Sequence, residues 1–196
     1  MPPRLRGRGG FRADGVVKYA TAPRLLQPTT IGELDGTPTP RIESVARFFR
    51  SAGFPTALSS NMDAWLKTHE AWISPLANAI YAAGGDAHAL ARDRPLLRSY
   101  VRAMREGFAV LDELGVPLTP PKFRLLRAMP DLLLVPALAR VLDTRLVEVL
   151  ATAHASAARE EMAVLAREFA ALADAAHVRT PAMDELASAA TACTHQ

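Results

Sequence analysis

Polar side chains suited to chemistry gather in residues 63–86, which have the sequence DAWLKTHEAWISPLANAIYAAGGD. Lys67 offers an ammonium group that can donate hydrogen bonds to a bound oxygen. Ser74 and Asn78 lie four residues apart, so a helix would place both side chains on one face. There they would present hydrogen-bonding groups to one pocket, or they would satisfy the backbone groups that Pro75 frees. The spacing alone agrees with both roles.

The remaining titratable residues do not form a metal-binding group. His69 follows Lys67 by two residues, so the two side chains do not share a helix face. His154 and Glu161 lie about two turns apart on one predicted helix. His154 is either a donor that lines a cleft or a structural histidine held by hydrogen bonds. Because no set of His, Asp and Glu residues has the spacing of metal ligands, we predict no metal site.

One long helix is expected to position the residues of this segment. Asn61 or Asp63 can cap its start, and the helical pattern then runs towards Ala83. Pro75 removes one backbone hydrogen bond, so we expect the helix to be broken or kinked near it. Gly84-Gly85 should end the helix, because glycine adopts a positive φ without strain.

A strand–helix–strand pattern precedes this helix. Asp35-Gly36 marks a turn. Thr39 suits the N-cap of the following helix, Pro40 suits its first position, and Gly53 suits its end. The order is typical of an α/β layer, but such a fragment is too small to form a stable sheet alone. The expected elements are strands at residues 16–19, 29–34 and 54–58 and a helix at residues 40–52.

Beyond residue 60, apolar residues recur at spacings of three and four, which is typical of helices. We therefore predict a mainly α fold, in which a helical domain of residues 61–192 follows an α/β remnant of residues 14–60. Residues 1–13 are rich in Arg, Gly and Pro and have the composition of a disordered basic tail. The further helices are expected at residues 93–114, 120–129, 131–142 and 144–175, with a last short helix from Pro181.

Composition excludes several classes of protein. The 196-residue chain is 49% hydrophobic and carries a formal net charge of +3. The apolar run at residues 132–138 is too short for a membrane span and contains Pro136. The basic start lacks the apolar core of a secretory signal and the interleaved aromatics of nucleic-acid-binding motifs. The single Cys193 gives no sign of an oxidising compartment. We expect a cytoplasmic protein that binds neither membranes nor nucleic acids.

Six segments, taken together and in this order, carry a family resemblance. They are IGELDG, TPRIE, AGF, DAWLKTH with SPLANAIYAAGGD, VRAMREGFAVLDELGVP, and HASAAREEM with LAREF. The series resembles the ketopantoate reductase family (2-dehydropantoate 2-reductase) over roughly residues 15–190. The resemblance implies an N-terminal Rossmann domain that binds NADPH. It also implies an all-helical C-terminal domain, similar to that of 6-phosphogluconate dehydrogenase, that holds the substrate. The family reaction is hydride transfer to a 2-keto acid, which gives a 2-hydroxy acid.

The cofactor-binding part of that family is missing from this sequence. A dinucleotide site needs a strand, then GxGxxG, then the start of a helix. The glycine cluster at residues 7–10 has no apolar strand before it and no helical pattern after it. We therefore interpret residues 14–60 as the end of a Rossmann domain whose first part is absent, as after gene truncation or a misplaced start codon. We expect this chain alone to bind NADP only weakly and not to turn over.

The resemblance assigns Lys67 as the general acid and the ligand of the substrate carbonyl. Hydride arrival puts negative charge on the carbonyl oxygen, which an ammonium group stabilises and protonates. In the family, asparagines follow one and two turns after the lysine, whereas this chain has Ala71 and Pro75 there. Aligned on the proline, Leu66 takes the lysine position instead. The two asparagine positions then fall at Glu70 and Ser74.

The same resemblance gives roles to residues further along the chain. Glu161 corresponds to a family glutamate near the cofactor ribose and the substrate, so we predict a cofactor contact there. Ser74, Asn78 and His154 are predicted to bind substrate. If these roles are right, Lys67 should face an open cleft beside the strands of residues 16–58.

A helical dimerisation or interaction module, or a non-functional fragment, is the alternative to a reductase domain. Helical domains of such dehydrogenases often bury helix faces between subunits, and the free edge of a small sheet invites pairing. The partners considered are therefore a 2-keto acid substrate, which the resemblance implies, and a second copy of the chain in a homodimer. Trp65 and Trp72 are assigned to the core, not to a binding surface.

Overall fold

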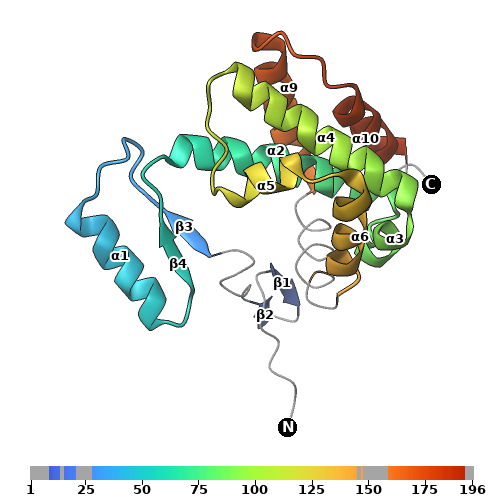
Figure 1. Ribbon diagram of the computed structural model, residues 1–196. Helices are drawn as coiled ribbons and strands as arrows, with labels where there is room; N and C mark the ends of the chain where they lie inside the picture. Colours follow the sequence, from blue (N-terminus) through green and yellow to red (C-terminus); the bar gives the residue numbers. More distant parts are fainter. Residues whose placement is uncertain (1–8, 14–15, 21–27, 145–146, 148–158, 193–196) are drawn as a thin grey trace.

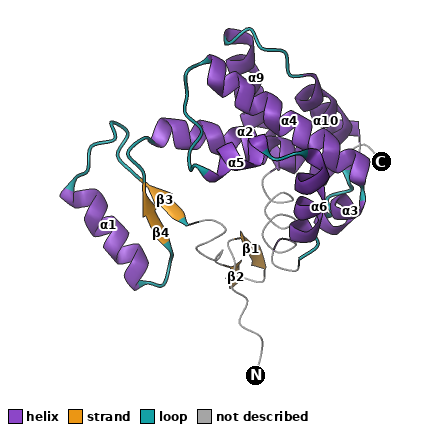
Figure 2. Cartoon of the chain, viewed as in Figure 1, coloured by secondary structure: helices purple, strands orange, loops and turns teal. Residues whose placement is uncertain are grey.

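The computed structural model describes residues 9–13, 16–20, 28–144, 147 and 159–192. This part of the chain is mainly helical, as predicted, with two small pairs of strands (Figures 1 and 2). Helix α3 (Ala87–Arg92) was not predicted from the sequence. Of the helix predicted at residues 144–175, the structure describes α9 (Arg159–Ala175). The other helices are α1 (Pro40–Ser51), α2 (Met62–Ala82), α4 (Arg94–Glu113), α5 (Lys122–Ala128), α6 (Asp131–Leu142) and α10 (Pro181–Ala192).

The first pair of strands corrects the prediction for the N-terminus. The expected disordered tail covered residues 1–13, but Gly9–Ala13 form strand β1. This strand pairs antiparallel with β2 (Val16–Ala20), in a register that sets Gly9 opposite Ala20. Composition misses such a strand because antiparallel pairing satisfies backbone groups whatever the side chains are.

The second pair confirms the strand–helix–strand order. Strand β3 (Thr29–Ile31) and strand β4 (Thr56–Leu58) are parallel, and α1 connects them and contacts β4. The Thr39 hydroxyl accepts the Ile42 N–H at 3.2 Å and so caps α1, as predicted. β3 is shorter than expected because a turn follows it at once, in which the Gly36 N–H donates to the Glu33 carbonyl at 3.1 Å.

Helix α2 forms as predicted but is not broken at its proline. The Asn61 side chain accepts the Ala64 N–H at 2.9 Å, so Asn61 is the N-cap. The helix continues through Pro75, whose neighbours Ser74 and Leu76 are buried with it. Packing on this buried stretch therefore outweighs the lost backbone hydrogen bond. The helix ends before Gly84-Gly85, both of which have positive φ.

The helical part is organised around α2, α4 and α10, each of which packs against the other two (Figure 1). At the α2–α4 crossing, Gly107 lets the backbones approach closely. A Cβ at Gly107 would lie 3.1 Å from both the Cβ and the carbonyl oxygen of Ala71. The surrounding core is apolar and includes the fully buried Phe108 and Phe169. The small residues therefore set how near the two helices lie.

Two charged side chains of α4 tie the other helices to this centre. The Glu106 carboxylate accepts the N–H groups of Ala182 and Met183 at 2.9 and 3.1 Å, and so caps α10 from a neighbouring helix. Arg105 donates to the Asp131 carboxylate at 2.5 Å and to the Met129 carbonyl at 2.6 Å, at the start of α6. Within the described ranges, no helix combines the length and hydrophobicity needed to cross a membrane.

Candidate functional site

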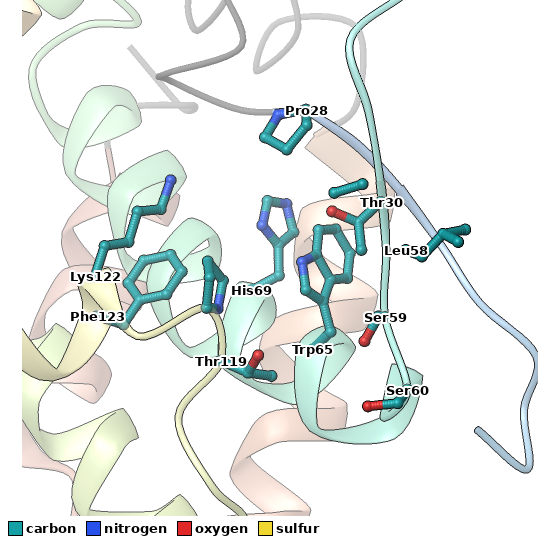
Figure 3. Close-up of a pocket in the computed structure, with 12 residues that line it drawn as sticks. Pro28, Thr30, Leu58, Ser59, Ser60, Trp65, His69, Thr119, Lys122 and Phe123 are labelled. Carbon is teal, nitrogen blue, oxygen red and sulfur yellow. The ribbon is translucent and has the colours of Figure 1, made fainter. Parts of the chain in front are cut away.

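An open cleft lies where the parallel strands meet the helical part (Figure 3). Its volume is about 220 Å³. Residues of β3, β4 and the β4–α2 connection form one wall, and residues of α2 and of the segment around the start of α5 form the other. We refer to this site as the β4–α2 cleft.

The strand wall is set by the parallel pairing. Thr30 and Ala57 are register partners, so their side chains lie on the same face of the sheet, and both line the cleft. The Ser59 N–H donates to the Ile31 carbonyl at 2.9 Å, which continues the pairing beyond β4. Ser59 and Ser60 then bring hydroxyl groups to the cleft next to the end of the strand. This wall is therefore partly polar and is held by backbone hydrogen bonds.

Aromatic rings form the helical wall. Trp65 and His69 lie four residues apart on α2, and their rings are stacked with centroids 5.0 Å apart and planes at 8°. The contacts continue from His69 to Trp72 at 5.6 Å and from Trp72 to Phe123 at 5.8 Å. This row of rings fixes the wall and gives the cleft a flat apolar side.

A buried hydroxyl holds the third part of the cleft in place. Thr68 donates to the Ala64 carbonyl at 2.7 Å and accepts the Thr119 N–H at 3.2 Å. This bond joins α2 to the segment before α5. Thr119 of that segment and Lys122, the first residue of α5, both reach the cleft (Figure 3). The Lys122 Nζ lies 5.4 Å from the centroid of the Phe123 ring. Burial against this wall lowers the pKa of Lys122 below its usual value.

Lys67 does not line the β4–α2 cleft, contrary to the expectation from the sequence. Its Nζ lies 2.8 Å from the Asp63 carboxylate on the same helix, and its side chain is 29% exposed. The reason is geometric: Trp65 and His69 take the helix face that meets the strands, and Lys67 lies between them in sequence, on another face. Leu66, the alternative at the family lysine position, is 52% exposed. The catalytic role of Lys67 stays a prediction that the cleft does not support.

Ser74 and Asn78 do come together, but elsewhere. Both line a cavity of about 40 Å³ between α2, α9 and α10, beside Phe169 and Thr180. Ser74 is only 1% exposed, so the small cavity offers little room for a ligand beyond a water molecule. This buried position fits the second role that the sequence allowed for Ser74 and Asn78, satisfying the backbone groups near Pro75, better than it fits substrate binding.

Glu161, one of the two late candidates, is not part of the cleft lining either. Glu161 lies exposed in the first turn of α9. His154 lies outside the described residues. The residues that sequence reasoning missed are Trp65, which was assigned to the core, and Lys122, which no motif marked. The spacing of Trp65 and His69 was the available signal, because it places both rings on one helix face.

The turn between β3 and α1 is the part of the described fold most like a dinucleotide loop, and it does not fit a pyrophosphate. A Cβ at Gly32 would lie 2.3 Å from the Ser59 carbonyl oxygen, and one at Gly36 would lie 2.2 Å from that of Ser60. Both glycines therefore serve packing against the β4–α2 connection. The carboxylate of Glu33, in the same turn, binds Arg41 and Thr39 at the start of α1, and these two hydrogen bonds hold its pKa below its usual value. A phosphate at this helix start would therefore meet a carboxylate.

Comparisons with protein-family models, with curated proteins and with solved structures find no match to this chain. No relative therefore supplies a function. Among the residues that the structure describes, no three His, Cys, Asp or Glu side chains gather as metal ligands. The cleft thus offers hydroxyl groups, a histidine, an ammonium group and an aromatic wall. This set suits recognition of a small polar molecule with an apolar part.

Proposed function

We propose that the chain is the substrate-side part of a 2-keto acid reductase similar to ketopantoate reductase, and that the β4–α2 cleft binds the keto acid. One observation carries the proposal: the cleft opens against parallel strands and the residues that follow β4, with helices opposite. Ligands of open α/β sheets bind outside the carboxyl ends of parallel strands. The sequence resemblance to the reductases supports the same assignment.

The lining of the cleft agrees with a small keto acid. Ser59, Ser60 and Thr119 offer hydroxyl donors for a carboxylate and a neighbouring carbonyl oxygen. Trp65 and Phe123 offer apolar surface for a short branched tail. A volume of about 220 Å³ suits a ligand of this size better than a dinucleotide.

Hydride transfer needs a cofactor site that the β3–α1 turn does not provide. We therefore assign to this chain binding and orientation of the keto acid, with NADPH held by a separate Rossmann domain. Lys67 and Glu161, to which the resemblance gave catalytic and cofactor roles, lie away from the cleft lining. Their roles in a complete enzyme require that the Rossmann domain contact Lys67 on α2 and Glu161 on α9.

Tryptophan fluorescence tests the proposal directly. The chain has two tryptophans, of which Trp65 lines the cleft and Trp72 packs on Phe123. We expect 2-oxoisovalerate to change the emission with a Kd of about 1 mM, and isovalerate, which lacks the keto oxygen, to bind several times more weakly. The Trp65→Phe variant should lose most of the signal change. Equal binding of the two acids would contradict the proposal.

A second candidate, a dimerisation module, is favoured by one surface. Leu132 and Leu133, in the first turn of α6, are 84% and 61% exposed. Adjacent exposed leucines of this kind mark interfaces when they form part of a larger apolar patch. Light scattering after size exclusion tests this candidate: a dimer that the Leu132→Glu variant converts to a monomer would support it. A monomer at all concentrations would contradict it.

A further inference from the structure

Charge is distributed unevenly around the β4–α2 cleft. Among the described residues that line it, Lys122 is the one lysine or arginine, and none is acidic. His69 is the other titratable group on the lining. A site with this charge favours an anion over a neutral or cationic ligand.

We infer that Lys122 holds the carboxylate of the small organic acid that the β4–α2 cleft binds. The inference rests on the proposed function and adds a specificity residue to it. Lys122 takes this place because Lys67, the lysine that the family resemblance indicates, is turned towards Asp63. Thr119 and the serines after β4 would then complete the carboxylate and carbonyl contacts.

The position of Lys122 is fixed by its neighbours. It is the first residue of α5, and the next residue, Phe123, is buried between Trp72 and Phe108. The Thr68–Thr119 hydrogen bond ties the preceding segment to α2. The side chain therefore starts from a rigid base, and Figure 3 shows it extending past the Phe123 ring. A cation on a preorganised base loses less conformational entropy when it binds.

The surroundings of Lys122 also strengthen a pair with an anion. Lys122 is an exposed residue of the cleft lining, and the neighbouring protein desolvates its ammonium group only in part, which lowers its pKa. Opposite charges attract more strongly where water is partly excluded. A bound carboxylate would offset the cost of this desolvation, and binding should weaken as salt concentration rises.

The test compares variants of Lys122 with a matched cation on the same helix. We expect Lys122→Met to weaken both 2-oxoisovalerate and isovalerate by about tenfold, because both acids carry the carboxylate. Lys122→Arg keeps the charge and should bind within about threefold of wild type. Arg124, exposed on α5 and outside the cleft lining, supplies the control variant Arg124→Met, which should bind as wild type does. Circular dichroism melting checks that each variant is folded.

The outcomes separate this inference from the proposed function. Unchanged affinity of folded Lys122→Met for both acids overturns the inference, as would a loss of affinity in Lys67→Met instead. A loss for the keto acid alone also overturns it, because Lys122 would then contact the keto oxygen. Wild type could bind the two acids equally, and Lys122→Met could weaken both. The first result would contradict the proposed keto acid reductase, and the second would support the contact between Lys122 and the carboxylate.

Discussion

Glu70 predicts how the stability of the helical part depends on pH. It lies on α2, half-buried, and one of its carboxylate oxygens is buried without a hydrogen-bond partner. Desolvation, and then the charge of Glu168 on α9, raise its pKa from 4.5 to about 7. At full burial this shift would correspond to about 3 kcal/mol, and solvent screening of a half-buried group reduces it to about 1–2 kcal/mol.

The sign of the effect follows from the direction of the shift. Between about pH 4.5 and pH 7 the folded protein holds a proton on Glu70 that the unfolded chain has lost, so stability falls as pH rises through this range. Above pH 7 the charged carboxylate is present in both states and its burial is a net cost. Glu70→Gln removes the charge, so we expect it to raise stability at pH 8 and to change it little at pH 4.5.

Thermal unfolding at several pH values measures this effect. A gain of about 1–2 kcal/mol corresponds to a rise in Tm of about 2–8 °C at pH 8 for a chain of this size. Glu168→Gln should give a smaller rise, because the charge of Glu168 is the second cause of the shift. Glu113→Gln, at an exposed site near the end of α4, is the control. An equal Tm change at pH 4.5 and pH 8, or a fall in Tm at pH 8, would refute the reasoning.

Three further substitutions test the packing that positions the site. Glu106→Ala leaves the start of α10 without its acceptor and should cost about 1–2 kcal/mol in urea unfolding, whereas Glu106→Gln should cost less. Gly107→Val places a branched side chain against Ala71 and should cost about 1–3 kcal/mol, measured in the same way. Thr68→Val removes the acceptor of the Thr119 N–H and should cost about 1–2 kcal/mol and weaken ligand binding in the cleft, and Thr68→Ser should restore both. Wild-type stability in any of the three destabilising variants would contradict the role given to that residue.

Local signals in the sequence predicted the elements of the fold well. Thr39 and Asn61 cap the helices that follow them, with side-chain acceptors at 3.2 and 2.9 Å from the backbone N–H groups they satisfy. Gly53 and the Gly84-Gly85 pair, all with positive φ, follow the ends of α1 and α2. These features depend on only a few neighbouring residues, which is why sequence alone reveals them.

The cleft was harder to predict because it depends on contacts between distant segments. Helical spacing places Trp65 and His69 on one face of α2, but it does not say that this face meets the strands. Lys122 reaches the cleft because Thr68 binds the backbone of Thr119, 51 residues away in sequence. The family resemblance directed attention to Lys67, whose face of the helix is set by the same packing and points elsewhere.

Chemical-shift mapping of the ¹⁵N-labelled chain with 2-oxoisovalerate tests the central claim most directly. The account predicts the largest shifts at the indole N–H of Trp65 and at the backbone amides of Ser60, Thr119 and Lys122, all on the cleft lining. Shifts centred on Lys67 or on the cavity of Ser74 and Asn78, or no shifts at saturating acid, would contradict it.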